Sequence, residues 1–128
     1  MKGKYGFCIV IMVLGSTSVT SLAQDRSVNE ALVFGFCYAL QAAMVCDDIS
    51  IRIDTEQKIE RKAGGEIRGP ASPYNKFCMG GLDAAFKDEN IADGNKKLCK
   101  KAWEFYGCSG TKIPKLLYQR NGAYCKYE

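Results

Sequence analysis

Cysteines constrain the fold of this chain of 128 residues more than any other residue type. One of the seven lies near the N-terminus, and the other six follow residue 23, at Cys37, Cys46, Cys78, Cys99, Cys108 and Cys125. An even number of cysteines in a short exported protein is typical of a disulfide framework. No C-x-x-C pair occurs, so the spacing favours neither a zinc knuckle nor a thioredoxin-type redox site. We therefore predict three structural disulfides.

The N-terminal residues have the pattern of a secretory signal peptide. Its three parts occur in order, as a basic start (Lys2, Lys4), an apolar run (residues 7–14, FCIVIMVL) and a small-x-small cleavage site (Ser21-Leu22-Ala23). The apolar run is far shorter than the roughly 20 residues needed to span a bilayer. We therefore expect residues 1–23 to be removed and residues 24–128 to form a single helical, disulfide-rich domain. The expected location is the periplasm, with secretion from the cell as the alternative.

Charge and composition exclude several classes of function. The chain has 18 Lys and Arg against 14 Asp and Glu, and two of the lysines belong to the predicted leader. Without those two lysines, positive charges exceed negative ones by only two. So weak a net positive charge does not favour nucleic acid as a partner. The chain has no histidine, which removes the commonest general base and the commonest zinc ligand. The sequence therefore predicts no catalytic residue, no metal and no cofactor.

The first predicted helix forms the centre of the fold. It begins at the capping box Ser27-Val28-Asn29-Glu30 and continues through residues 31–46 (ALVFGFCYALQAAMVC). Only Gln41 is strongly polar in this run, so we expect burial on most sides and a thin polar strip through Glu30 and Gln41. A second membrane span is the alternative, but the segment is short for one. The mature chain should therefore have no stable membrane span.

Three more helices are expected, over residues 54–63, 74–86 and 95–106. Capping residues are Asp54 for the second helix and Asp93 for the fourth, and glycines end both, at Gly64-Gly65 and Gly107. Gly80-Gly81 in the middle of the third helix predicts close packing against a neighbouring helix or a local break. Together these patterns predict an all-α fold, a small four-helix domain stapled by three disulfides.

The connecting segments are less regular. Residues 47–53 alternate isoleucine with polar residues, which predicts an extended stretch lying on the core. After Gly107 we expect irregular structure with at most one helical turn at residues 113–117. The tail contains an Asn-Gly turn signal and should be held by Cys125 rather than by regular structure.

Helical geometry limits how the cysteines can pair. Cys37 and Cys46 lie in one predicted helix, about 13.5 Å apart and on opposite faces. A disulfide requires Cα atoms within about 7 Å, so these two cysteines must reach other elements. The same argument separates Cys99 from Cys108 if the fourth helix extends that far. Many pairings remain open, and we favour Cys37–Cys78, Cys46–Cys99 and Cys108–Cys125.

Three groups of side chains are candidate interaction sites. A basic arc on the fourth helix could attract lipid phosphate, a cell-wall polymer or an acidic protein face, although a solvated helix face also explains it; it comprises Lys96, Lys97, Lys100 and Lys101. An acidic group lacks the pattern of a calcium-binding loop and is explained by capping and loop solvation; it comprises Asp47, Asp48 and Asp54. An aromatic group belongs to the core or lines a pocket; it comprises Trp103, Phe105 and Tyr106.

Residues 99–107 (CKKAWEFYG) form a cysteine-bearing helix that runs into Tyr-Gly, followed by Gly110 and the segment 114–117 (PKLL). This ending resembles that of a group of small exported bacterial proteins of uncharacterised function. A buried helix ending at Cys46 and a helix carrying Cys78 also fit the group, whereas Cys108 and Cys125 are additions to it. The resemblance implies a periplasmic all-α protein and supplies no functional residues. More loosely, the layout is similar to periplasmic immunity proteins that neutralise cell-wall-cleaving toxins, and to small acid-stress chaperones.

The sequence thus predicts an exported, non-enzymatic binding or interaction protein, such as an inhibitor or an immunity-type factor. Its partner would be another protein or a component of the cell envelope. The alternative is a periplasmic stress chaperone that exposes apolar surface at low pH. Because the chain has no histidine, such a switch would depend on carboxylates and act below about pH 5. An enzyme built on Asp47, Asp48 and Asp54 is a third possibility, which nothing in their spacing supports.

Overall fold

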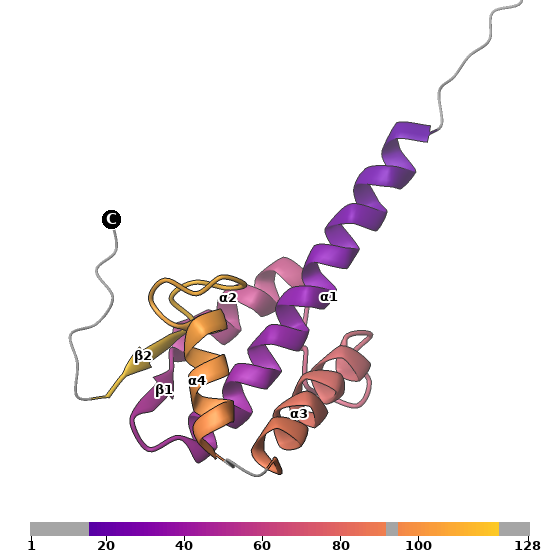
Figure 1. The fold of residues 1–128 in the computed structure, drawn as a ribbon. Coiled ribbons are helices and arrows are strands. Elements are labelled where there is room, and N and C mark those ends of the chain that lie inside the picture. The colour runs from indigo at the N-terminus through magenta and orange to yellow at the C-terminus, as the bar shows by residue number, and fades with distance from the viewer. Residues whose placement is uncertain (1–15, 92–94, 121–128) are drawn as a thin grey trace, which may run out of the picture.

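The structure, a computed structural model, describes residues 16–91 and 95–120, with side chains from residue 29 onward except that of Ile53. It contains four helices and a two-stranded sheet in the order α1 (Ser16–Val45), β1 (Ile49–Ile51), α2 (Ile53–Ala63), α3 (Asn75–Glu89), α4 (Asn95–Tyr106) and β2 (Leu117–Gln119). Helix α1 runs through the middle, with α3 along one side and α4 with the sheet on the other (Figure 1). The four predicted helices are confirmed, and the fold is mainly helical. Within the described ranges no helix combines the length and apolar composition needed to cross a membrane.

Helix α1 begins earlier than predicted. It is continuous from Ser16 across the expected cleavage site, so the prediction that it starts at the Ser27 capping box is wrong for the whole chain. Residues 16–26 contain neither glycine nor proline. Nothing in the backbone therefore interrupts the helix before Ser27, and a capping box acts only at the residue where a helix begins.

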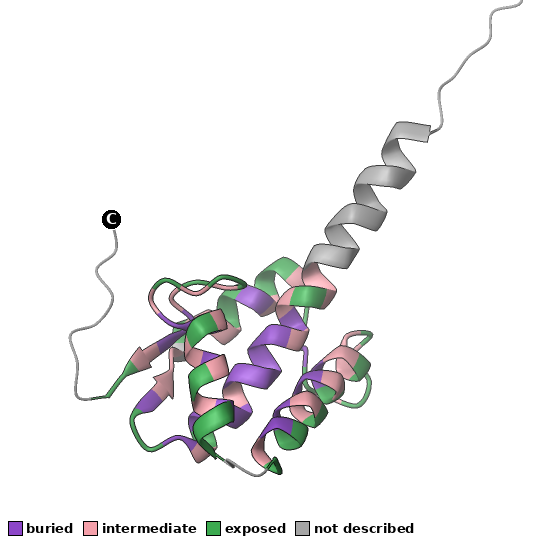
Figure 2. Cartoon of the chain, viewed as in Figure 1, coloured by how far each residue is buried: buried purple, intermediate pink, exposed green. Residues whose placement is uncertain are grey.

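Within the domain, α1 is buried on most sides, as predicted (Figure 2). Its buried apolar residues are Val33, Phe36, Cys37, Tyr38, Ala39, Ala42 and Ala43. The expected polar strip is wrong, because Gln41 is only 8% exposed. Gln41 follows Cys37 by one helical turn and so lies on the same face. The disulfide of Cys37 turns that face toward α3, whereas Met44 in the last turn of α1 is 75% exposed.

Helix α3 packs closely against α1 at the predicted glycine pair. A Cβ atom built on Gly81 would lie 2.2 Å from the carbonyl oxygen of Phe34, so only glycine permits this approach of the two backbones. A Cβ atom on Gly80 would lie 3.5 Å from the Phe34 ring, an ordinary contact. Helix α3 is continuous through both glycines. Close packing is therefore the reason for the pair, and no break occurs.

Helix α2 starts differently from the prediction. Its N-cap is Arg52, and Asp54 lies inside the first turn, where it accepts a hydrogen bond from Lys58 Nζ at 2.8 Å. The chain leaves β1 at Arg52 in extended conformation and its amide donates to Leu116 O, so the helix starts at Ile53 before Asp54 can cap it. Asp54 still favours the helix as a negative charge near its positive N-terminus. The predicted C-terminal stop is confirmed, since Gly64 adopts a φ of +80°.

The expected helical turn is absent, since residues 113–116 form no helix and the segment continues into the strand β2. β2 pairs antiparallel with β1, with Ile49 opposite Gln119 and Ile51 opposite Leu117. The extended stretch predicted before α2 is thus confirmed, and it supplies free backbone groups that β2 satisfies. Leu116 and Leu117 are fully buried. Regular structure therefore holds this segment, and the all-α description is corrected to a mainly helical fold with a small sheet.

Two of the predicted disulfides are described and confirmed. Cys37–Cys78 joins α1 to α3 with a Cα–Cα distance of 5.1 Å, and Cys46–Cys99 joins the end of α1 to α4 at 5.9 Å. Cys108 is also disulfide-bonded. The predicted Cys108–Cys125 pairing lies outside the described residues, as does the Asp93 cap.

Candidate functional site

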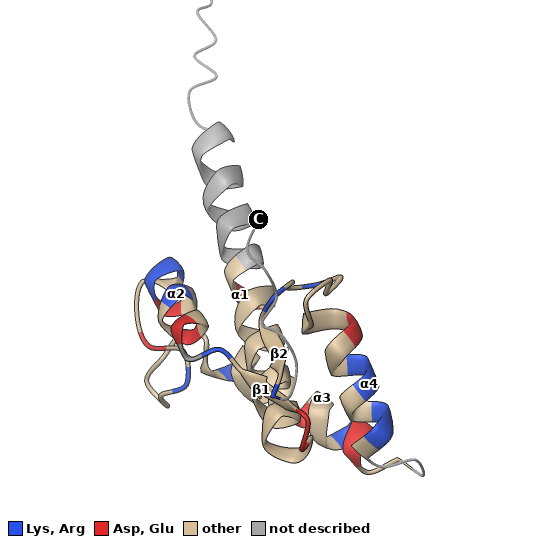
Figure 3. Cartoon of the chain, turned by 90° about the vertical axis from the view of Figure 1, so that its left-hand side faces the viewer, with Lys and Arg blue, Asp and Glu red and all other residues tan. Residues whose placement is uncertain are grey.

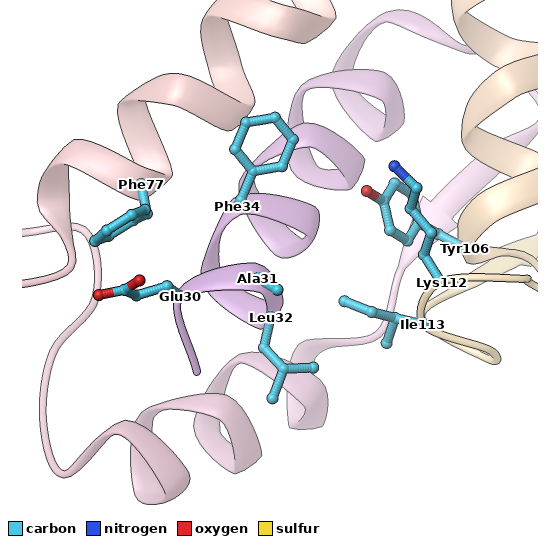
Figure 4. A pocket seen from close by; sticks show the side chains of 8 residues that line it. All are labelled: Glu30, Ala31, Leu32, Phe34, Phe77, Tyr106, Lys112 and Ile113. Atoms are coloured by element: carbon cyan, nitrogen blue, oxygen red, sulfur yellow. The ribbon is translucent and has the colours of Figure 1, made fainter. Parts of the chain in front are cut away.

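A groove of about 660 Å³ opens beside the first turns of α1 whose side chains are described. Side chains from α1, α3, the end of α4 and the following loop surround it (Figure 4): Glu30, Ala31, Leu32, Phe34, Phe77, Tyr106, Lys112 and Ile113. Six of these eight are apolar or aromatic. Ligand pockets are typically lined in this way, with a few polar groups at defined positions.

The loop that closes one side of the groove is anchored to α4. The carbonyl oxygen of Phe105 accepts hydrogen bonds from the amides of both Lys112 (3.0 Å) and Ile113 (3.1 Å). The Lys115 amide donates to Gly107 O at 2.7 Å, which secures the far end of the loop. Lys112 Nζ also lies 4.2 Å from the centre of the Phe105 ring, a favourable cation–π distance. These contacts hold Lys112 and Ile113 at the groove edge.

Tyr106 links the groove to the core. It is 2% exposed, and its ring centre lies 5.8 Å from that of Tyr38 and 5.9 Å from that of Phe105. Burial raises the pKa of Tyr106 to about 12, so its phenol stays neutral at physiological pH. The two interpretations of the aromatic group, as core residues or as pocket lining, therefore both apply to Tyr106. Trp103 and Phe105 are half-buried and pack against the core.

A second depression, of about 470 Å³, adjoins the groove. Helix α2 provides most of its wall, and its lining residues are Leu32, Thr55, Lys58, Ile59, Arg61, Lys62 and Ile113. Leu32 and Ile113 line both spaces, so the two are neighbours across this apolar pair. The second space has an apolar floor with three cations around it.

A buried carboxylate ties three helices together away from the groove. Asp88 on α3 is 8% exposed, and its Oδ2 accepts a hydrogen bond from Tyr38 Oη on α1 (2.7 Å) and one from Lys101 Nζ on α4 (2.9 Å). Burial alone would raise the pKa of Asp88, but these hydrogen bonds and the charges of Lys101 and Lys97 outweigh it, so the pKa lies below its ordinary value. Burial and the nearby Asp88 raise the pKa of Tyr38.

Asp88→Asn is expected to lower the free energy of unfolding at pH 7 by about 2 kcal/mol, because hydrogen bonds to a buried charge are lost. The folded-state pKa is depressed, so this stabilisation is present above the unfolded pKa of about 4 and disappears as pH falls through the folded value. Urea unfolding at pH 7 and at pH 2.5 measures the free energy of unfolding of Asp88→Asn and of the unmodified protein. A difference that is equally large at the two pH values would contradict this role.

The basic and acidic groups named as candidate sites from the sequence do not each form a single site in the structure. Basic residues lie along α4 (Figure 3). Lys96, Lys97 and Lys100 are exposed there, whereas Lys101 forms an ion pair with Asp88. The acidic group does not converge: Asp47 and Asp48 are exposed in the turn before β1, and Asp54 pairs with Lys58 on α2. Among the described residues no group of three His, Cys, Asp or Glu side chains could hold a metal ion.

The groove was not predicted from the sequence. Its walls include Leu32 and Phe34, which periodicity places in a helix buried on most sides. In the structure both are half-buried and Ala31 is exposed, because the neighbouring elements leave this part of α1 partly uncovered. The sequence does contain one signal of an open groove. The first predicted helix has apolar residues on nearly all of its faces at the start of the domain, which is more apolar surface than neighbouring elements can cover.

No protein-family model, curated protein or solved structure matches the chain. The groove, the adjoining basic depression and the buried Asp88 are therefore the features from which a function is inferred.

Proposed function

We propose that this protein is an exported, non-enzymatic binding protein that takes an apolar group of its ligand into the groove beside α1. The observation that carries the proposal is the groove itself, with walls of Leu32, Phe34, Phe77 and Ile113 from three separate parts of the fold. Its volume of about 660 Å³ lies within the range of ordinary ligand pockets, about 300–1,000 Å³. The expected ligand is a component of the cell envelope or an apolar segment of another protein.

The frame of the groove is suited to binding because it is rigid. Cys78 directly follows Phe77, and Cys37 lies one turn after Phe34, so the disulfide between them fixes two walls of the groove relative to each other. A preformed site loses less conformational entropy when it binds than a flexible one. The disulfides thus support a binding role as well as stability.

Export is supported by the chemistry of the chain. Disulfides persist in oxidising compartments, and two join the central helix to its neighbours. The leader pattern of residues 1–23 and the resemblance to small exported bacterial proteins favour the periplasm. The lack of histidine in the sequence favours a role without catalysis.

Ala31→Glu tests the groove directly. Ala31 is exposed and lines the groove, so a glutamate there adds a charge to the site without removing a core contact. We expect the purified protein, with its disulfides intact, to bind the neutral fluorescent probe N-phenyl-1-naphthylamine, and Ala31→Glu to weaken binding at least about tenfold. Fluorescence titration provides the measurement.

The matched control is Met44→Glu. It introduces the same charge on the same helix at a residue that is 75% exposed and does not line the groove. We expect binding of the probe to be unchanged in this variant. Equal loss in both variants, or no saturable binding by the unmodified protein, would refute the groove as the binding site.

A second candidate function, the acid-stress chaperone, is favoured by the Asp88 network. Protonation of Asp88 removes the charge that connects Tyr38 and Lys101, so acid weakens the contacts among α1, α3 and α4. A chaperone of this kind would suppress the aggregation of a denatured client protein at pH 2–4 and not at pH 7. The absence of suppression at pH 2–4, measured by light scattering, would eliminate this candidate.

A further inference from the structure

We infer that the ligand is an anionic amphiphile with a single hydrocarbon chain, such as a long-chain carboxylate. This inference rests on the proposed binding function and adds the chemical class of the ligand. The chain would lie in the groove beside α1 and extend across Leu32 and Ile113. The anionic head group would lie at the basic edge formed by α2.

Continuity of apolar surface gives the ligand its shape. The groove and the second depression share Leu32 and Ile113, so their apolar floors adjoin. Ile59 of α2, which is 5% exposed, continues this floor into the second depression. An elongated apolar path of this kind fits a flexible hydrocarbon chain better than a compact ring system. Each methylene group that the path buries should tighten binding about fourfold.

The charged side chains around the two spaces indicate the charge of the ligand and its orientation. The two spaces are lined by four cations, Lys58, Arg61, Lys62 and Lys112, and by one carboxylate, Glu30. Glu30 lies beside Phe77, across the groove from Lys112 and Ile113 (Figure 4). Attraction by the three cations of α2 therefore directs an anionic head toward that helix.

Two of the cations on α2 are available to a ligand. Lys58 is neutralised in part by Asp54, whose carboxylate lies 2.8 Å from its Nζ. Arg61 and Lys62 are exposed and form no ion pair with another described residue. An exposed charge contributes only a few-fold to affinity, so the apolar path provides most of the binding and the cations select the head group.

The test is displacement of N-phenyl-1-naphthylamine by amphiphiles of matched chain length, used below their micelle concentrations. Dodecanoate should displace the probe at a concentration about tenfold lower than dodecyltrimethylammonium, because the cations attract only the former. Octanoate should be roughly 250-fold weaker than dodecanoate, because it has four fewer methylene groups to bury. Equal displacement by the two amphiphiles would overturn the inference about the head group. Saturable binding of the probe in the same experiment would still support the proposed binding function.

Two charge variants locate the head group. The double variant R61Q/K62Q should abolish the preference for dodecanoate over dodecyltrimethylammonium. The matched control K96Q/K100Q removes the same charge from α4, on the opposite side of the fold (Figure 3), and should keep the preference. Equal loss in both variants would indicate a net-charge effect and overturn the site. Sedimentation that shows a dimer dissociated by the probe would assign the groove to a second copy of the chain instead.

Discussion

Replacing Cys46 and Cys99 together by alanine is expected to lower the free energy of unfolding by about 4 kcal/mol. The two residues are 53 positions apart, and a crosslink that closes a longer loop removes more entropy from the unfolded chain. Urea denaturation of the oxidised proteins measures the loss. Chemical reduction of the unmodified protein should produce at least as large an effect.

The disulfide between Cys37 and Cys78 offers a matched comparison. Its separation of 41 residues predicts a slightly smaller loss for the double alanine variant, again about 4 kcal/mol. A domain of this size is commonly stable by only about 5–15 kcal/mol, so either loss is a large fraction of the total. A decrease below about 1 kcal/mol in both variants would show that the core alone holds the helices together.

Gly81→Ala is expected to destabilise the protein by about 3 kcal/mol or more. The new methyl group would lie 2.2 Å from the carbonyl oxygen of Phe34 and 3.0 Å from the backbone nitrogen of Tyr38. Neither backbone atom can move without displacing α1, so α3 must shift away from it. Thermal unfolding by circular dichroism measures the loss.

Gly80→Ala is the control for this substitution. It makes the same chemical change one residue earlier in α3, but its Cβ would meet only the edge of the Phe34 ring, at 3.5 Å. Alanine favours a helix by about 1 kcal/mol relative to glycine, so this variant should be neutral or more stable. Similar losses in the two variants would mean that helix packing at Gly81 is not the cause.

Local signals in the sequence were sufficient for most helix boundaries. The fourth helix was predicted over residues 95–106 and occurs there, because its apolar and charged residues alternate with helical period and Gly107 follows. The start of α2 was misplaced because it depends on where the chain leaves β1, and β1 is defined by its pairing with residues 117–119. A strand of three residues with a distant partner leaves little local pattern.

The site was less predictable than the fold for a related reason. Periodicity shows which residues of a helix are apolar, but it does not show which of them lack a covering neighbour. Phe34 and Leu32 differ from the buried Val33 and Phe36 only in what packs against them. No local pattern marks Asp88 as buried either, because only the arrangement of α1, α3 and α4 brings Tyr38 and Lys101 to it.

Nuclear magnetic resonance titration of the ¹⁵N-labelled protein with N-phenyl-1-naphthylamine tests the groove most directly. The binding account predicts that the largest amide shift changes occur at residues 30–34, at Phe77 and at residues 112–113, which surround the groove. The exposed face of α4 around Lys96 and Lys100 should not respond. Changes confined to α4, or the absence of any saturable change, would contradict the proposal that this protein binds its ligand in the groove beside α1.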